Sequence, residues 1–167
     1  AALVGKEAEA YAFMSQQGAL INFEDTGKTV AFFYINTDGS VVIRKPTDYI
    51  AKVISLAGGH YVYEHLAGDD RASSVSSVTM ENFYATAADA DLLIYNAAIV
   101  SPISSVDELI AKDSLFADFK AVQEGNVWCT GKSYFQATDA VADMIRDIHT
   151  AMVGGDESTM SFFYRVS

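Results

Sequence analysis

Six side chains suited to holding a large ligand fall in three loops, each of which follows a predicted strand. The loops span residues 36–45, 96–101 and 131–136. The six side chains are two cations, two amides and two aromatics: Arg44, Lys45, Asn96, Gln136, Tyr134 and Phe135. Loops after the carboxyl ends of strands line the ligand crevice in an open α/β sheet. The pattern therefore predicts a binding site for a large, partly anionic and partly flat ligand.

Three further residues adjoin these loops. Tyr34 and Asn36 lie at the carboxyl end of the first predicted strand, and Trp128, the only tryptophan, lies just before the third loop. We expect them to contact the ligand as well, because aromatic rings pack against flat groups and an amide supplies hydrogen bonds. In the alternative interpretation, Arg44 and Lys45 form a solvated turn and the loop aromatics cover the core. The residues alone leave both interpretations open.

Motifs for catalysis or metal binding are weak. Residues 125–133 resemble a phosphate-binding P-loop but have five residues between the glycines instead of four, and no G-x-S-x-G nucleophile motif is present. His60 and His65 are five apart with no third ligand at a recognised spacing, which favours surface or capping histidines over a metal site. Asp89 and Asp91 fit a polar helix end before a strand. We expect no enzyme, no bound metal and no resident cofactor.

Composition places the chain among folded domains. Of its 167 residues, 50% are apolar and 20% are charged, which is enough apolar material for the core of one domain. The formal net charge of −11 disfavours nucleic acid and anionic lipid as partners. Residues 28–60 carry +2 (four basic, two acidic), whereas residues 61–124 carry −8 (three basic, eleven acidic). The single Cys129 cannot form an internal disulfide and is interpreted as a buried apolar side chain.

Strands and helices alternate along the predicted chain. Apolar and β-branched runs predict strands at 28–36, 92–96, 126–130 and 160–166, with 41–43 extending the first or pairing with it. Apolar spacing and capping residues predict helices at 3–17, 49–57 (capped by Thr47 or Asp48), 80–88 (starting at Thr79), 105–112 (Ser104 or Ser105) and 138–152. Residues 67–78 are expected to be a surface loop. This order predicts a three-layer α/β/α sandwich with a mostly parallel central sheet.

Three segments resemble, in order, the C-terminal lobe of class III solute-binding proteins of ABC importers, the receptors for ferric siderophores, haem and cobalamin. They are GSVVIRKPTDYIAKVISLAGGHYV, SSVTMENFYATAADADLLIYN and LFADFKAVQEGNVWCTGKSYFQ. The family pattern in them is a helix ending in L-A-G-G, a helix opening with Ser/Thr-x-Glu before a strand, and A-V-x-x-G-x-V before a short strand. The resemblance covers about residues 28–152. The family's usual Pro-Asp before the central strand is Ala90-Asp91 here.

The resemblance implies an organisation for the whole chain. Residues 1–20 resemble the end of the helix that joins the two lobes of the family, and residues 21–167 the C-terminal α/β lobe. The family's N-terminal lobe is absent from this chain, and we expect a leader or a larger N-terminal piece to precede Ala1. The implied protein lies outside the cytoplasmic membrane, in the periplasm or at the cell surface. A lipid anchor on the missing part is expected to be its only membrane attachment.

The resemblance also implies a function without catalysis. A binding protein would capture an iron chelate, haem or cobalamin and deliver it to the ABC permease. We expect this protein to be a monomer. Glu81, in Thr79-Met80-Glu81, occupies the position of the family glutamate that docks with permease arginines. Arg44 and Lys45 match by position the basic residues that contact anionic siderophores in several members. The alternative function is a surface ligand-relay or interaction domain of the same fold that does not dock to a permease.

Overall fold

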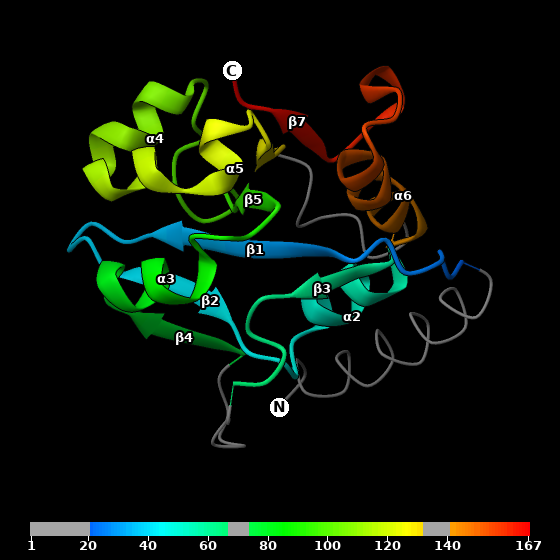
Figure 1. Cartoon of the computed structure of the whole chain (residues 1–167), viewed down its shortest axis with the longest axis horizontal. Coiled ribbons are helices and arrows are strands. Elements are labelled where there is room, and N and C mark those ends of the chain that lie inside the picture. Colours follow the sequence, from blue (N-terminus) through cyan, green and yellow to red (C-terminus); the bar gives the residue numbers. More distant parts are fainter. Residues whose placement is uncertain (1–20, 67–73, 132–140) are drawn as a thin grey trace.

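Strand β1 is the centre of a seven-stranded sheet in the computed structural model, which describes residues 21–66, 74–131 and 141–167. The strands are β1 (Lys28–Ile35), β2 (Val41–Arg44), β3 (Gly59–Tyr61), β4 (Val75–Val78), β5 (Leu92–Tyr95), β6 (Val127–Thr130) and β7 (Phe163–Arg165). Their order is β4-β2-β1-β5-β6-β7, and β3 pairs with β1 (Figure 1). Strands β1, β3, β5 and β6 are parallel, whereas β2, β4 and β7 run antiparallel to their neighbours.

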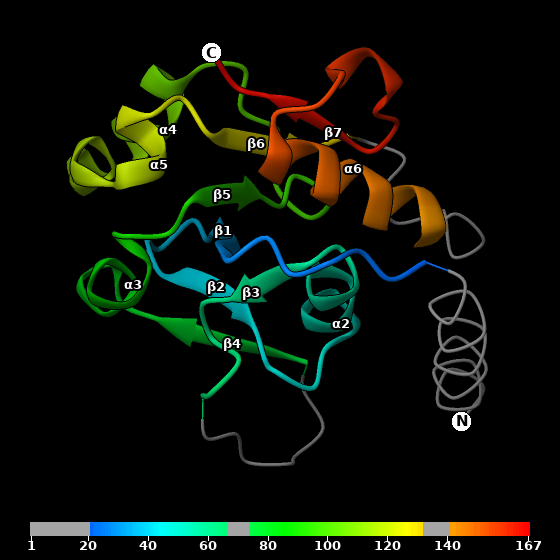
Figure 2. The ribbon, with the colours of Figure 1, turned by 45° about the vertical axis from the view of Figure 1, so that its right-hand side comes forward.

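The helices lie on both faces of this sheet. They are α2 (Tyr49–Leu56), α3 (Met80–Ala87), α4 (Val106–Lys112), α5 (Lys120–Gln123) and α6 (Val141–Val153), with short 3-10 helices η1 (Ser114–Asp118) and η3 (Glu157–Thr159). Figure 2 shows α2 and α6 on one side of the sheet and α3, α4 and α5 on the other. The expected three-layer α/β/α fold is therefore confirmed, with a sheet that is parallel in its centre and antiparallel at both margins.

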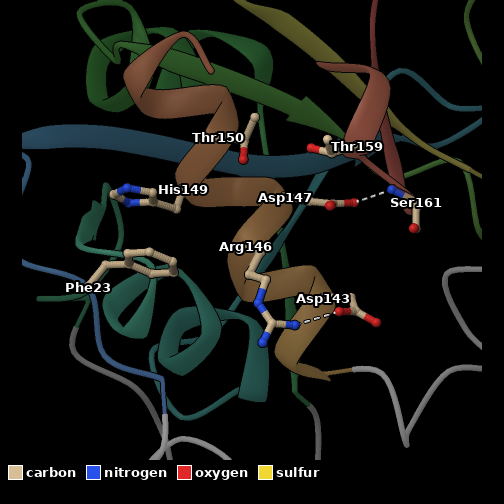
Figure 3. A pocket seen from close by; sticks show the side chains of 8 residues that line it. All are labelled: Phe23, Asp143, Arg146, Asp147, His149, Thr150, Thr159 and Ser161. Carbon is tan, nitrogen blue, oxygen red and sulfur yellow. Dashed lines mark hydrogen bonds and ion pairs between the residues drawn. The ribbon is translucent and has the colours of Figure 1, made fainter. Parts of the chain in front are cut away.

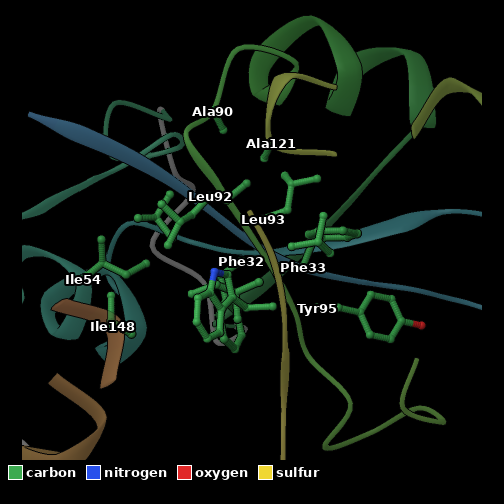
Figure 4. Packing of buried hydrophobic residues seen from close by; sticks show 14 of the residues in the cluster. Phe32, Phe33, Ile54, Ala90, Leu92, Leu93, Tyr95, Ala121 and Ile148 are labelled. Carbon is green, nitrogen blue, oxygen red and sulfur yellow. The ribbon is translucent and has the colours of Figure 1, made fainter. Parts of the chain in front are cut away.

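Strand alternation explains how β1 is buried on both faces. The ring of Phe33 packs against Phe83 of α3 and Phe116 of η1, at centroid distances of 4.6 and 5.6 Å. Phe32 points to the opposite face, toward the side of Ile54 and Ile148 (Figure 4). Because both faces carry helices, β1 is apolar along nearly its whole length, as the run at 28–36 predicted.

Capping side chains set the helix starts near the predicted positions. Asp48 accepts the N–H of Ile50 at 2.9 Å at the start of α2. Thr79 and Ser105 cap α3 and α4 in the same way, at 3.3 and 3.2 Å from their backbone donors. Each cap supplies an acceptor to a helix N–H group that has no partner within the helix.

The predictions differ from the structure at several places within the described residues, including η1 and α5, which were not predicted. Residues 75–78, predicted as part of a surface loop, form the margin strand β4, because Val75–Val78 pairs with Val41–Arg44. Strand β3 was not predicted, since only three residues form it directly after the end of α2. The terminal strand is shorter than predicted and occupies Phe163–Arg165. The predicted helix at 3–17 lies outside the described residues.

Gly58 ends α2 and fixes the segment that leads into β1. Its φ is +85°, and a Cβ there would collide with the carbonyl oxygen of Glu24. The N–H groups of Phe23 and Thr26 donate to the carbonyls of Leu56 and Gly58 at 3.0 and 2.8 Å. Only glycine combines this backbone conformation with such a close approach, which explains the glycine at this position.

Candidate functional site

The carboxyl ends of the parallel strands meet at one edge of the sheet, as predicted. Asn96 directly follows β5, and its N–H donates to the carbonyl of Phe33 in β1 at 2.7 Å. The next residue, Ala97, donates its N–H to the hydroxyl of Thr130, the last residue of β6, at 2.8 Å. These two bonds join the ends of β1, β5 and β6 into one edge. We refer to the residues at these strand ends and the two turns beyond them, 36–40 and 96–102, as the carboxyl edge.

Asn96 is completely buried at the carboxyl edge. Its side-chain Oδ1 accepts the N–H of Ala98 at 3.2 Å, which fixes the start of the loop after β5. Its Nδ2 group has no hydrogen-bond partner among the described residues. An unpaired buried amide donor is costly in a folded protein. Asn96 therefore positions the loop, rather than presenting an exposed amide to a ligand as the sequence suggested.

Asn36 starts the turn that connects β1 to β2. Its Nδ2 donates to the Ser40 hydroxyl at 3.1 Å, and that hydroxyl donates to Asp38 Oδ1 at 2.6 Å. The Ser40 N–H also donates to Asp38 Oδ1, at 2.9 Å. Hydrogen bonds from the Ser40 hydroxyl and N–H hold the pKa of Asp38 below its usual value. The exposed carboxylate at the tip of this turn is thus charged, and sequence analysis had not singled it out.

Arg44 does not lie at the carboxyl edge, which corrects the prediction. Strand β2 turns back along β1, so Val41 pairs with Ile35 and Arg44 is three residues further back, about 10 Å from the edge. The prediction failed because it treated residues 36–45 as one loop, whereas residues 41–44 form a strand that returns along β1.

The side chain of Arg44 is 10% exposed and pairs with Asp48 at 3.4 Å. Its carbonyl accepts the Tyr61 hydroxyl at 2.8 Å. Lys45 follows it, half-buried, and donates its N–H to the carbonyl of Ser74 at 2.9 Å. Both residues therefore belong to the β2–β4 margin of the sheet instead of to the carboxyl edge. They do not form the solvated turn of the alternative interpretation either.

The structure describes only two of the aromatic candidates for ligand contact, and both lie wholly or partly in the core. Trp128 is 1% exposed, and the guanidinium of Arg165 lies 4.5 Å from the centre of its ring. This burial places Trp128 in the core, beyond direct reach of a ligand. Tyr34 is half-buried and packs against the core from β1. The three candidates of the third loop, Tyr134, Phe135 and Gln136, lie outside the described residues.

Glu81 is exposed in the first turn of α3, on the face of the sheet opposite α2 and α6. Hydrogen bonds from its own backbone N–H and from the side chain of Thr79 hold the pKa of this carboxyl below its usual value. The helix N-terminus also favours an acidic side chain there. Glu81 is therefore an accessible carboxylate that is charged at neutral pH.

A pocket of about 320 Å³ lies beside α6 (Figure 3). The rings of Phe23 and His149 stack on one side of it, with centroids 3.8 Å apart. On the other side, Asp147 Oδ2 accepts the N–H groups of Ser161 and Phe162 at 2.9 and 2.7 Å. Sequence analysis missed this pocket because its walls come from segments more than a hundred residues apart. Its polar groups largely hold β7 and the segment before β1 against α6.

Neither a metal-binding cluster nor a membrane-spanning helix occurs in the described parts of the chain. No three or more His, Cys, Asp or Glu side chains in residues 21–66, 74–131 and 141–167 are placed to hold a metal ion. None of the helices in these ranges is long and apolar enough to cross a membrane.

Comparison with solved structures identifies proteins of the same fold. No protein-family model matches the chain, and no curated protein matches its sequence. An Fe3+-hydroxamate ABC transport protein of Saccharomonospora viridis aligns over 89% of this chain with a TM-score of 0.62 and 17% identity. The periplasmic haem-binding protein HutB of Vibrio cholerae aligns over 86% with a TM-score of 0.61 and 14% identity. An ABC transporter substrate-binding protein of Listeria monocytogenes aligns over 86% with a TM-score of 0.60 and 16% identity.

These proteins are longer than the present chain. The alignments cover 49%, 55% and 55% of the three solved proteins, so the chain spans about half of their length. All three are described as binding or transport proteins rather than enzymes. The described residues thus have the fold of one lobe of ABC-importer solute-binding proteins, which confirms the fold expected from the resemblance.

Proposed function

We propose that this chain is the C-terminal lobe of the extracytoplasmic solute-binding component of an ABC importer. The observation that carries the proposal is the fold match over 86–89% of the chain to about half of each of three solved binding and transport proteins. In such a protein the carboxyl edge faces a second lobe, and the solute is buried between the two. The binding protein is monomeric, lies in the periplasm or at the cell surface, and is anchored as a lipoprotein through its N-terminal part.

The proposed solute is an iron chelate such as a ferric siderophore, or haem, or cobalamin. Two of the structurally similar proteins are described as an Fe3+-hydroxamate transport protein and a haem-binding protein, which supports this range of ligands. Asn36 and the turns of the carboxyl edge supply hydrogen-bonding groups around the solute. Tyr34, Tyr134, Phe135 and Gln136 remain proposed contacts of this lobe.

A fluorescence titration tests the capture of solute. Trp128 is the only tryptophan, so its emission reports on one place in the core, beside the carboxyl edge. We expect saturable changes with one of three probes: a ferric siderophore, haemin or cyanocobalamin. Asn36→Ala should weaken that binding, whereas Lys52→Ala on the exposed side of α2 should leave it unchanged. If no probe gives a saturable change, or if both variants weaken binding equally, the proposal is wrong.

Docking to the permease is the second part of the proposal. Glu81 is exposed and charged, and its carboxylate fits an arginine on the partner by a charge-assisted hydrogen bond. Glu81→Lys replaces that attraction by repulsion, and we expect solute uptake in cells to collapse while solute affinity is unchanged. Asp118→Lys makes the same charge change at the end of η1 and should preserve uptake.

The second candidate function is a surface ligand-relay or interaction domain of the same fold. It differs from the first function in making no contact with a permease. Under this function Glu81→Lys binds solute normally and leaves uptake unchanged. The uptake measurement therefore separates the two functions.

A further inference from the structure

The carboxyl edge carries one fixed negative charge at the tip of the β1–β2 turn. Asp38 is exposed, and its Oδ1 accepts both the hydroxyl and the N–H of Ser40, at 2.6 and 2.9 Å. Asn36 donates to the same hydroxyl at 3.1 Å, so the carboxylate is held by a chain of hydrogen bonds that starts at the end of β1. These bonds keep Asp38 ionised and limit its movement.

The two turns of this edge, residues 36–40 and 96–102, hold no other charged side chain. A cation is present at the end of β5, where the ammonium group of Lys112 lies 5.9 Å from the ring centre of Tyr95. The turn after β1 offers amide and hydroxyl groups, and the loop after β5 reads Asn-Ala-Ala-Ile-Val-Ser-Pro, with the Ile99 side chain 56% exposed. Arg44, which the sequence had assigned to the ligand, pairs with Asp48 about 10 Å behind the edge. The chain as a whole carries −11, so its long-range field also repels anions.

We propose that Asp38 makes the carboxyl edge select metal chelates by charge, favouring cationic or uncharged chelates over anionic ones. This inference rests on the proposed solute-binding function and narrows its substrate class. An uncharged chelate meets amide, hydroxyl and aliphatic groups at the edge. An anionic chelate must also approach the Asp38 carboxylate, which the hydroxyl and N–H of Ser40 hold in place. The unfavourable Coulomb interaction acts over several ångströms in a partly desolvated cleft, where screening is weaker than in bulk water.

Three forms of one chelate test this selection. Ferrioxamine B carries a free ammonium group, its N-acetyl derivative is uncharged, and its N-succinyl derivative is anionic, while the hydroxamate sphere around the iron is the same in all three. We expect the dissociation constant, measured by calorimetry at low ionic strength, to rise from cation to anion by about threefold per unit of charge. Asp38→Asn should flatten this trend, and Asp38→Lys should reverse it.

The controls separate a local effect from the general charge of the chain. Asp118→Asn removes the same charge from the end of η1 and should keep the full trend. Equal affinity for the three forms, tighter binding of the anionic form, or equal effects of Asp38→Asn and Asp118→Asn would overturn the inference. If haemin or cyanocobalamin binds and none of the three chelates does, the inference fails and the proposed function survives. If nothing binds, both fail.

Discussion

The buried polar side chains at the two ends of the parallel strands differ in how completely they are hydrogen-bonded. At the amino ends, Asp91 accepts hydrogen bonds from the ammonium groups of Lys28 and Lys120 at 3.3 and 2.8 Å and from the N–H and hydroxyl of Thr29 at 2.9 and 3.1 Å. At the carboxyl ends, the buried amide of Asn96 keeps a donor without a partner among the described residues. Paired charges stabilise the fold at the amino ends, whereas one buried amide donor stays without a partner among the described residues at the end where a solute is proposed to bind.

The largest expected effect tests whether Arg44 stabilises the fold at the β2–β4 margin instead of binding solute. Arg44 and Asp48 form a buried pair, with side chains 10% and 4% exposed. Arg44→Met leaves Asp48 buried without its cation, and we expect a loss of about 3 kcal/mol in the free energy of unfolding, measured by urea denaturation. Solute affinity should not change. Lys52→Met on the exposed side of α2 is the control, with an effect below about 0.5 kcal/mol. If Arg44→Met keeps the wild-type denaturation midpoint but binds solute more weakly, Arg44 belongs to the solute-binding site and this prediction is wrong.

The next effect concerns Asp91, whose side chain is 12% exposed. Asp91→Asn removes the charge that Lys28 and Lys120 share and one acceptor that Thr29 uses. Because both ammonium groups are partly solvated, we expect a loss of about 2 kcal/mol at pH 7 in the free energy of unfolding. Asp118→Asn, which removes an exposed carboxylate, should leave the denaturation curve unchanged. Equal losses in the two variants would show that the network at the amino ends contributes nothing specific.

The same network predicts how stability depends on pH. Burial opposes ionisation of Asp91, but the hydrogen bonds from Lys120 and Thr29 outweigh it and hold the pKa of Asp91 well below the ordinary 3.8. The unfolded chain therefore binds this proton at a higher pH than the folded chain does. The contribution of Asp91 is complete above about pH 4 and is lost as the pH falls further. Urea denaturation from pH 7 to pH 2 should show the wild type approaching Asp91→Asn below pH 4. A constant difference down to pH 2 would contradict this.

Local patterns predicted most of the elements that build both ends. The apolar runs of β1 and β5 and the caps Asp48, Thr79 and Ser105 are visible within a few residues of sequence, because strand alternation and helix capping are local effects. Strand β3 was missed since it has only three residues, and β4 because its Ser-Ser centre reads as a turn. The main error concerned the direction of β2, which places Arg44 and Lys45 at the β2–β4 margin of the sheet instead of at the carboxyl edge.

The partners of the polar side chains could not be predicted from the sequence. Asp91 meets Lys28 across 63 residues, and His149 meets Ala57 across 92. Such pairs follow from the order of strands in the sheet, which no local pattern specifies. Asp91 was correctly assigned a place between a helix and a strand. Its role as the acceptor that joins β1, β5 and α5 appears only in the folded chain.

The smallest expected effect tests the carboxyl end directly. Asn96→Ala removes the acceptor for the Ala98 N–H, which is destabilising, and also the buried donor without a partner, which is stabilising. The two contributions oppose one another, so we expect a net loss of only about 1 kcal/mol, although Asn96 is fully buried. Thr29→Val is the matched comparison at the amino end, because its hydroxyl donates to Asp91 and accepts the Asp91 N–H, and both bonds are lost. It should cost more than Asn96→Ala in the same urea experiment. If Asn96→Ala costs more than Asp91→Asn, the polar groups at the carboxyl end stabilise the fold no less than those at the amino end, and the contrast between the two ends fails.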